Sequence, residues 1–509
     1  MSRKKVKKHS KETKNRFLLL FVGIFLLLSL LLFDPKLFTG GDNAVYAILA
    51  RSIARGKGYK DLYLPDEQPH TQYPFGFPLL LAPLVLIFGT NVLMLKCLVL
   101  LTGVAAFYFM CKICESLFRG KSYIILSMFI SIPIFAIYNH WILSEMPFLF
   151  FSLGAVYLLM KTSAGRGHFY YLAFMFAIFA FFIRAAGISL ILGITVWLLV
   201  KGRYKQLAIF IILFLIIFVP WQIRNAGITT SGGYLDQLLA KNPYQMEAGR
   251  ITLLGLMTRV WDNLVLYAFT ILPVSLMPFL KQGSVAVMVG LLFVALTGIG
   301  FFWRAKNLTV FEFYFTFGVL VLLGWPKVWS SDRFLLPILP IFLIYAYFGL
   351  SWLKEKINFK YMIEVFAGIF VLFNILEILP MVRQAIQDNT AYLKGDLHAG
   401  YTADWQRYFE LIAWMQHNIP KDRIIMARKP EFVYLLSGHK SFRYPFTTNQ
   451  EEVARAIARC DFVVLDNFYW TGTSRRYLFP VLQKTPEAYE IVKQTRRPEF
   501  YLLRVKGKS

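Results

Sequence analysis

The sequence predicts a polytopic α-helical membrane protein with about eleven transmembrane helices and a C-terminal α/β domain on the extracytoplasmic side. Three observations predict this class. Hydrophobic residues make up 57% of the 509 residues, whereas soluble domains are about 45–50% apolar. Apolar runs that are long enough to cross a bilayer recur as far as residue 383 and then stop. Short loops rich in Lys and Arg separate the runs, as is typical of cytoplasmic loops.

The chain begins with a basic tail, residues 1–16, that we expect in the cytoplasm. Eight Lys and Arg lie in this tail, and the apolar run Phe17–Phe33 follows with no small-residue cleavage site after it. We therefore expect a retained first span. The formal net charge of +26 is spread over many short loops and is not gathered in one soluble domain. For this reason we exclude nucleic acid as a partner.

Loop charge sets the expected topology, with the N-terminus inside and the C-terminus outside. Five loops carry a net positive charge and are expected in the cytoplasm: residues 115–122, 161–168, 201–205, 303–307 and 351–360. All five loops can lie in the cytoplasm only if two apolar stretches do not cross the membrane and lie at its outer interface. One is Phe77–Phe88, which is short for a span. The other is Ile251–Leu280, which charged residues interrupt. The expected parts are a transmembrane domain over residues 17–383, with an external first loop over 34–91, and an extracytoplasmic domain over 384–509.

The last domain is predicted to be a soluble α/β domain, because no long apolar run follows Gln384. Its expected elements are helices over Asp404–Asn418 and Glu451–Arg459, buried strands over Ile424–Ala427 and Phe462–Leu465, and a final hairpin within Val492–Val505.

Asp42 is the first candidate catalytic residue. It follows two glycines and precedes an amphipathic stretch, Val45–Gly56, in which apolar residues recur at helical spacing while Arg51 and Arg55 lie four apart. We expect this helix to lie in the membrane interface, where it would present a carboxylate and two cations among lipid headgroups. A general base needs a carboxylate within hydrogen-bond reach of the acceptor hydroxyl. The alternative is that Asp42 only caps the helix.

Glu145 is the second candidate, in the segment His140–Pro147 between the third and fourth predicted spans. An acid at membrane depth is costly and needs a partner, whereas the alternative is an acid that stabilises the first turn of a helix. Six cations fall on the same predicted outer side: Arg51, Arg55, Arg184, Arg224, Lys327 and Arg333. Arginine suits bidentate contact with phosphate, although snorkelling at the interface also explains any single one of them.

Several other kinds of site are not indicated. The chain has no Walker loop, no G-x-G-x-x-G and no H-E-x-x-H motif, so a donor used outside the membrane is expected to be lipid-linked. Cys111-x-x-Cys114 has no second pair, which favours two packing residues. His70 has no second ligand at metal-binding spacing, which favours a loop histidine. We expect no metal site and no cofactor.

Together these segments resemble the glycosyltransferase C (GT-C) superfamily. The closest branch is that of protein O-mannosyltransferases, aminoarabinose transferases and related bacterial membrane glycosyltransferases. The resemblance rests on the first-loop Asp42 and on six later motifs: Tyr73–Pro83, Ser144–Pro147, Pro220-Trp221-x-x-Arg224-Asn225, Arg333-Phe334-x-x-Pro337-x-x-Pro340, Arg428-Lys429-Pro430 and Tyr434–Gly438. Their order covers nearly the whole chain.

The resemblance implies an inverting transferase that uses a polyprenyl-phosphate sugar in the plasma membrane, the inner membrane of a cell envelope. Asp42 would be the general base, and Glu145 would orient the acceptor or nearby cations. The cations expected at the donor phosphate are Arg224 and Arg333, ahead of Arg55, Lys57 and Arg184. The acceptor would be a protein, a lipid or a glycan.

Two departures from the family pattern qualify these expectations. The family often has Asp-Glu where this chain has Asp42-Asn43, which argues against a metal bound by paired carboxylates. Aminoarabinose-type members carry Lys before the paired prolines, where this chain has Gln72 and Tyr73 before Pro74, so that sugar is not favoured. The alternative functions are a transporter or flippase, which would often show paired repeats that we do not see, and a polymerase or ligase of surface polysaccharide.

Overall fold

The computed structural model describes residues 3–118, 120–162, 167–228, 234–243, 249–281 and 283–507. The chain forms two compact units. The first contains Met1–Asp34, Thr71–Phe77 and Lys96–Ile386, and the second contains Pro35–His70, Pro78–Leu95 and Gln387–Ser509. Residues of the predicted first loop therefore belong to the same unit as the C-terminal α/β domain. The domain boundaries expected from the sequence stay a prediction.

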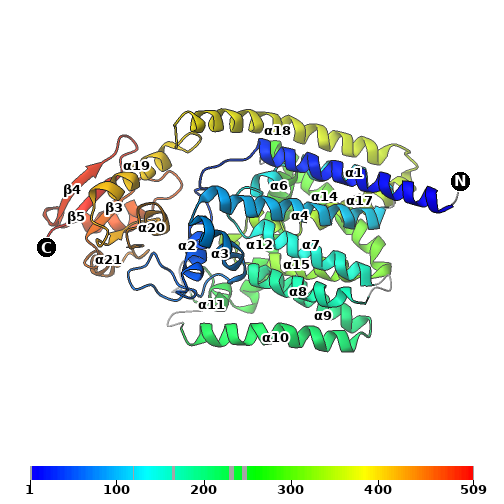
Figure 1. Cartoon of the computed structure of the whole chain (residues 1–509), viewed down its shortest axis with the longest axis horizontal. Helices are drawn as coiled ribbons and strands as arrows, with labels where there is room; N and C mark the ends of the chain where they lie inside the picture. The colour runs from blue at the N-terminus through cyan, green and yellow to red at the C-terminus, as the bar shows by residue number, and fades with distance from the viewer. Residues whose placement is uncertain are drawn as a thin grey trace. The chain divides into compact units, whose positions relative to one another are not determined.

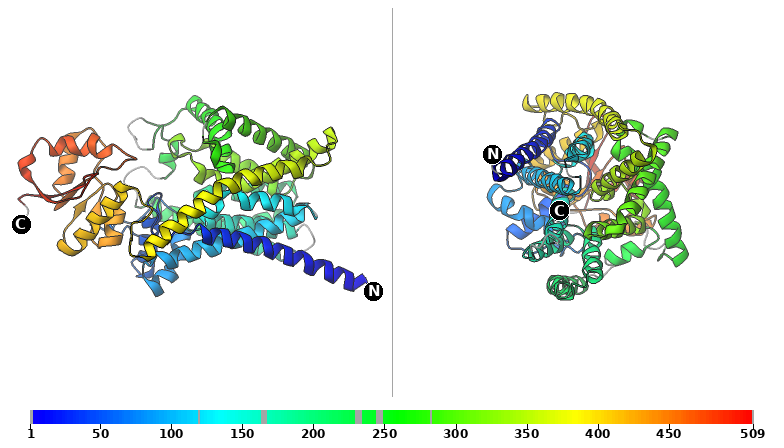
Figure 2. Two further views of the ribbon diagram at one scale, coloured as in Figure 1. Left: turned by 90° about the horizontal axis from the view of Figure 1, so that it is seen from above. Right: turned by 90° about the vertical axis from the view of Figure 1, so that its right-hand side faces the viewer.

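The first unit is a bundle of long helices, which run roughly side by side in Figures 1 and 2. Its principal helices are α1 (Arg3–Leu31), most of α4 (Val92–Phe118), α5 (Ser122–Ser131), α6 (Pro133–Tyr138), α7 (Glu145–Thr162), α8 (Phe169–Ile183), α9 (Ile188–Val200), α10 (Tyr204–Ala226), α12 (Leu253–Leu266), α13 (Leu272–Leu276), α14 (Ser284–Arg304), α15 (Val310–Gly324), α16 (Asp332–Leu335), α17 (Leu339–Ile357) and most of α18 (Met362–Leu393). Four helical stretches of the described chain are long and apolar enough to cross a bilayer: Val92–Phe118, Tyr204–Ala226, Ser284–Asn307 and Met362–Leu393.

A buried glutamate fixes one end of this bundle. Glu312 completes a capping box with Thr309 at the start of α15. Its Oε1 accepts hydrogen bonds from Arg304 Nε at 2.6 Å and from the Tyr345 hydroxyl at 3.1 Å, so one carboxylate joins α14, α15 and α17. Helices α14 and α17 also approach closely at Gly300, where an added Cβ would lie 1.9 Å from the Tyr345 carbonyl oxygen. Only glycine permits that contact.

The second unit contains a five-stranded mixed sheet in the order β2-β1-β3-β5-β4. Strands β2, β1 and β3 are parallel, and β5 pairs antiparallel with both β3 and β4. Its elements are α2 (Asn43–Ala54), most of α3 (Gly76–Phe88), α19 (Ala403–Asn418), β1 (Ile425–Met426), α20 (Pro430–Ser437), β2 (Ser441–Phe442), α21 (Gln450–Ile457), β3 (Phe462–Leu465), α22 (Phe479–Leu482), β4 (Tyr489–Gln494) and β5 (Tyr501–Val505). The two predicted helices, the two buried strands and the final hairpin are confirmed within a few residues.

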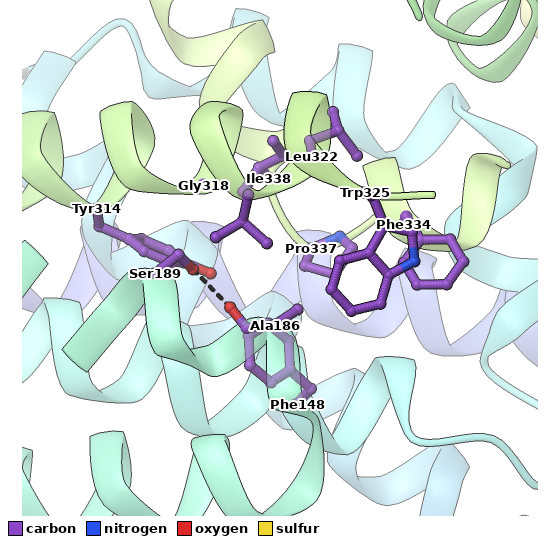
Figure 3. Close-up of a pocket in the computed structure, with 11 residues that line it drawn as sticks. Phe148, Ala186, Ser189, Tyr314, Gly318, Leu322, Trp325, Phe334, Pro337 and Ile338 are labelled. Atoms are coloured by element: carbon purple, nitrogen blue, oxygen red, sulfur yellow. Dashed lines mark hydrogen bonds between the residues drawn. The ribbon is translucent and has the colours of Figure 1, made fainter. Parts of the chain in front are cut away.

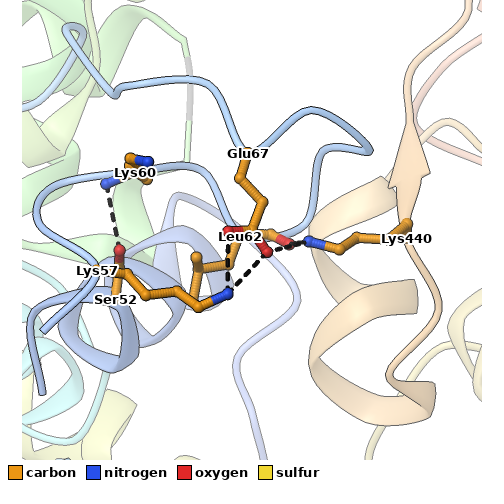
Figure 4. A network of polar contacts seen from close by, with 6 residues as sticks. All are labelled: Ser52, Lys57, Lys60, Leu62, Glu67 and Lys440. Atoms are coloured by element: carbon orange, nitrogen blue, oxygen red, sulfur yellow. Dashed lines mark hydrogen bonds and ion pairs between the residues drawn. The ribbon is translucent and has the colours of Figure 1, made fainter. Parts of the chain in front are cut away.

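Polar contacts fasten the loop that follows α2 to the sheet of this unit (Figure 4). Glu67 forms ion pairs with Lys57 at 3.0 Å and with Lys440 at 2.7 Å. The hydrogen bonds from these two lysines hold the pKa of Glu67 below its usual range. Beside them, the Ser441 amide donates to the Tyr63 carbonyl at 2.7 Å. The edge strand β2 is therefore bonded to a segment that lies nearly 400 residues earlier in the chain.

Helix α2 differs from the expectation of an interfacial helix. Eight of its residues are buried: Asn43, Ala44, Tyr46, Ala47, Ile48, Leu49, Ala50 and Ser52. Ile48 packs against Leu62 and Tyr434, and Arg51 lies over the Tyr434 ring at 5.8 Å. The small residues Ala44, Ala47 and Ala50 allow other segments of the protein to pack closely on more than one side of the helix. The helix is thus held by its own unit and does not expose a continuous apolar face to lipid.

The loop-charge topology can be tested by labelling single cysteines with an impermeant reagent in intact cells. Cysteines placed at the exposed residues Val328 and Tyr469 should react from outside. Cysteines at Lys205 and Lys356 should react only after permeabilisation, because they lie at helix ends in segments of net positive charge that we expect in the cytoplasm. Reaction at Val328 and Tyr469 from opposite sides of the membrane would contradict the predicted topology.

Candidate active site

Glu145 is the centre of a buried ion-pair cluster in the first unit. Its side chain is 1% exposed, and Oε1 lies 2.9 Å from Arg184 Nη1 and 2.6 Å from Arg333 Nε. The three residues come from separate segments, which the loop-charge topology places on the same side of the membrane. Glu145 balances one of the two guanidinium charges, and Asp332, which also interacts with Arg333, is a second carboxylate beside them. The structure therefore brings together three of the residues that the sequence singled out.

Local structure explains how the two arginines reach Glu145. Arg184 ends α8 in an extended conformation (φ −151°, ψ 127°), so the helix stops at this residue. Its Nη1 donates to Ser144 Oγ at 3.1 Å, and its Cζ lies 5.0 Å from the centre of the Phe334 ring. Arg333 lies in the short helix α16, where its amide donates to Asp332 Oδ1 at 2.9 Å.

A second set of polar groups supports the segment before Arg333. Asn263 Nδ2 donates to the carbonyl oxygens of Leu323 and Trp325 at 2.8 and 2.7 Å. Its Oδ1 accepts from the Ser330 hydroxyl at 3.0 Å. Burial raises the pKa of the Asp332 carboxyl above its usual range, although the Arg333 amide and the Tyr138 hydroxyl donate to it. The hydrogen bonds of Asn263 thus attach the segment before Arg333 to helix α12.

Two polar atoms of the cluster have no hydrogen-bond partner among the described residues: Glu145 Oε2 and Arg184 Nε. An unsatisfied buried polar atom is costly, and such atoms at a cleft are suited to bind a ligand group. A narrow apolar pocket lies close by, because Phe334 contacts Arg184 and also lines this pocket with Phe148 and Trp325 (Figure 3). The arrangement places cations beside an apolar lining.

An aromatic stack connects this cluster with Arg224. The guanidinium of Arg224 lies 4.9 Å from the Trp221 ring, Trp221 contacts Phe75 at 5.0 Å, and Phe75 stacks on Phe182 at 4.9 Å. Phe75 belongs to the proline-rich motif that the sequence pointed out. The next residue, Gly76, approaches the Phe182 backbone so closely that an added Cβ would lie 2.6 Å from it. The motif therefore positions the end of α8, two residues before Arg184.

Asp42 lies in the second unit, at the N-cap position of α2, and its side chain makes no capping hydrogen bond. Its surroundings include Lys429 of the C-terminal domain. Burial lowers the pKa of the Lys429 ammonium, and the negative charges of Glu431 and Asp42 oppose this shift. Lys429 also lies 3.6 Å from Glu431. Lys429, whose side chain is 15% exposed, therefore joins the charges around Asp42.

The remaining predicted residues have other surroundings. Arg55 is exposed at the end of α2, and Lys57 pairs with Glu67. His70 is buried, with its Nδ1 2.9 Å from Asp61, as suits a structural loop histidine. Cys111 and Cys114 are buried free thiols within α4, which fits the packing interpretation.

The sequence analysis did not select Asn263, Asp332 or Lys429 as site residues. Asn263 lies in the interrupted apolar stretch, where polar residues indicated only that the stretch does not span. Asp332 precedes Arg333 in a quoted motif, and Lys429 lies in another. A signal was therefore present for the last two, namely an ionisable residue inside a motif that already carried the resemblance.

The fold is similar to that of ArnT from Cupriavidus metallidurans. The crystal structure of that protein bound to undecaprenyl phosphate matches with a TM-score of 0.59 and 11% identity, and the apo structure with a TM-score of 0.54 and 13% identity; each match covers 96% of this chain and 98% of ArnT. No protein-family model and no curated protein matches the chain significantly. The chain thus has an ArnT-like fold, largely helical with several apolar spans and a C-terminal mixed sheet. The number of spans stays a prediction.

Proposed function

We propose that this protein is a membrane glycosyltransferase that moves a sugar from a polyprenyl-phosphate donor to an acceptor on the outer face of the plasma membrane. The observation that carries the proposal is the Glu145 cluster, in which Arg184 and Arg333 meet one carboxylate beside an apolar pocket. A phosphate on an isoprenoid chain needs both cations and an apolar surface. The ArnT-like fold supports the proposal, because the ArnT structure was solved with undecaprenyl phosphate bound.

In the proposed reaction the acceptor hydroxyl oxygen attacks the anomeric carbon, and the bond from that carbon to the phosphate oxygen breaks. Asp42 accepts the hydroxyl proton, and polyprenyl phosphate leaves with the bonding electron pair. Attack from the face opposite the leaving group inverts the anomeric configuration. Because no second carboxylate adjoins Asp42 in the sequence, we assign no metal to this step.

The cations act on the leaving group. Negative charge grows on the phosphate as the glycosidic bond breaks, so fixed guanidinium groups stabilise the transition state more than the bound donor. We assign Arg333 and Arg184 to this role, with Glu145 holding both in place. Arg224 is assigned as a second contact that the aromatic stack through Phe75 positions. Arg55 and Lys57 are weaker candidates, because Arg55 is exposed and Lys57 is paired with Glu67.

Replacing Asp42 by Asn tests the general base. The substitution keeps the size of the side chain and removes its basicity, so transfer should fall by about 10²–10⁴-fold while the protein remains folded and inserted. Asp66→Asn is the matched control, because Asp66 is an exposed carboxylate of the same loop, and it should keep wild-type transfer. If the turnover of Asp42→Asn stays within a few-fold of wild type, Asp42 is not the general base and only marks the start of α2.

Variants of Arg333 test the donor-phosphate contact. Arg333→Lys keeps the charge but loses the planar fork and should retain some activity, whereas Arg333→Ala should have almost none, mainly through lower turnover. Lys327→Ala is the control, since Lys327 is a half-exposed cation of the same loop that pairs with Asp262. Single-turnover assays with a short-chain polyprenyl-phosphate sugar give both turnover and donor affinity.

Equal loss in Lys327→Ala, or unchanged kinetics in both Arg333→Ala and Arg224→Ala, would exclude the assigned contact. The same assay separates the proposal from a flippase. A transferase releases polyprenyl phosphate and extends an acceptor, whereas a flippase moves the intact donor across the bilayer.

Chelation tests the expectation that no metal takes part. Transfer should survive exhaustive treatment with EDTA, because Asp42 is followed by Asn43 and no second carboxylate is available there. Loss of transfer that added magnesium or manganese restores would require ligands that the present assignment lacks.

A further inference from the structure

A basic groove lies at the far end of α17 from the Glu145 cluster. Its lining includes Lys121, Lys354, Lys360, Glu355, Phe359 and Tyr347, and it holds about 1130 Å³ of empty space, part of it open to solvent. Arg333 precedes α17 and Lys354 lies in the last turn of that helix. At about 1.5 Å per residue, Leu339 at the start of α17 and Lys354 in its last turn are separated by roughly 22 Å along the helix.

The groove carries a positive charge that its acidic neighbours do not cancel. Three lysines face one lining carboxylate, that of Glu355. Lys354 lies 3.6 Å from Glu364, whose side chain is 43% exposed, so this pair is weak and solvated. Lys360 lies 5.1 Å from the ring of Tyr361. An incoming anion can therefore recruit these ammonium groups without breaking a strong buried pair.

A buried hydroxyl supplies the second observation. Tyr347 lines the groove, its side chain is 5% exposed, and its hydroxyl has no hydrogen-bond partner among the described residues. The ring is held against Phe118 at 4.6 Å. A tyrosine hydroxyl that is buried in this way usually has a partner, and a ligand oxygen in the groove would provide one.

We propose that this groove binds a phosphate group, either the headgroup of an anionic phospholipid or a soluble phosphate. Lys121, Lys354 and Lys360 would supply charge, and the Tyr347 hydroxyl would donate a hydrogen bond to a phosphate oxygen. The loops that form the groove are those that the topology places in the cytoplasm, where anionic lipids and basic juxtamembrane segments meet. This site is separate from the proposed transfer reaction, so its failure would leave that proposal intact.

The lipid source is tested with the full-length protein, delipidated in a neutral detergent. Phosphatidylglycerol is titrated in, and bound lipid is counted by native mass spectrometry, with phosphatidylcholine as the reference. The triple variant Lys121→Gln, Lys354→Gln, Lys360→Gln should weaken phosphatidylglycerol binding by about a hundredfold. The matched control, Lys201→Gln, Lys205→Gln, Lys356→Gln, removes the same charge from lysines outside the groove lining and should leave binding within a few-fold of wild type.

The soluble source is tested with inorganic phosphate in the same detergent. A rise in Tm with phosphate, which the groove triple variant abolishes and the control triple retains, would identify a soluble ligand. Tyr347→Phe removes only the hydroxyl and should weaken whichever ligand binds by roughly fivefold. Equal weakening by the two triple variants, or no selective binding of either probe, would overturn the proposal.

Discussion

A buried carboxylate that must be neutralised organises the helical unit. Glu145 is almost fully enclosed, and a charge in such a place is stable only when it is paired. Both of its partners come from other segments, and Arg333 lies 188 residues away in sequence. The end of α8, the start of α7 and the loop before α17 are therefore held to one point. The aromatic stack and the bonds from Asn263 are supports around that point.

The same chemistry recurs at the other end of the bundle. Glu312 satisfies its own helix start and also binds Arg304 and Tyr345, and it has one cation where Glu145 has two. A single pair such as Glu312 and Arg304 stabilises packing. The Glu145 cluster adds a second guanidinium, which interacts with Asp332 and which the phosphate of a ligand could also contact.

Much of the fold could be predicted from local patterns. Strand Phe462–Leu465 has the predicted bounds because it is a short apolar run between polar turns. Glu145 and Arg333 could be selected singly, as an acid and a cation near span ends. Their pairing could not, because nothing local says which arginine closes on Glu145. The packing of Tyr434 against α2 could not be predicted either. Tyr434 lies almost 400 residues later in the chain, and no pattern within the helix sequence identifies it as a partner.

The bond between the first loop and strand β2 has a consequence for synthesis. Lys440 Nζ donates to the Leu62 carbonyl across 378 residues. At about 5–20 residues per second, a ribosome needs roughly 20–75 s to reach Lys440 after Leu62 has been made. During that interval the helix that carries Asp42 has emerged without the domain that later buries it. The second unit can therefore reach its final fold only near the end of translation, after the helical spans have been made.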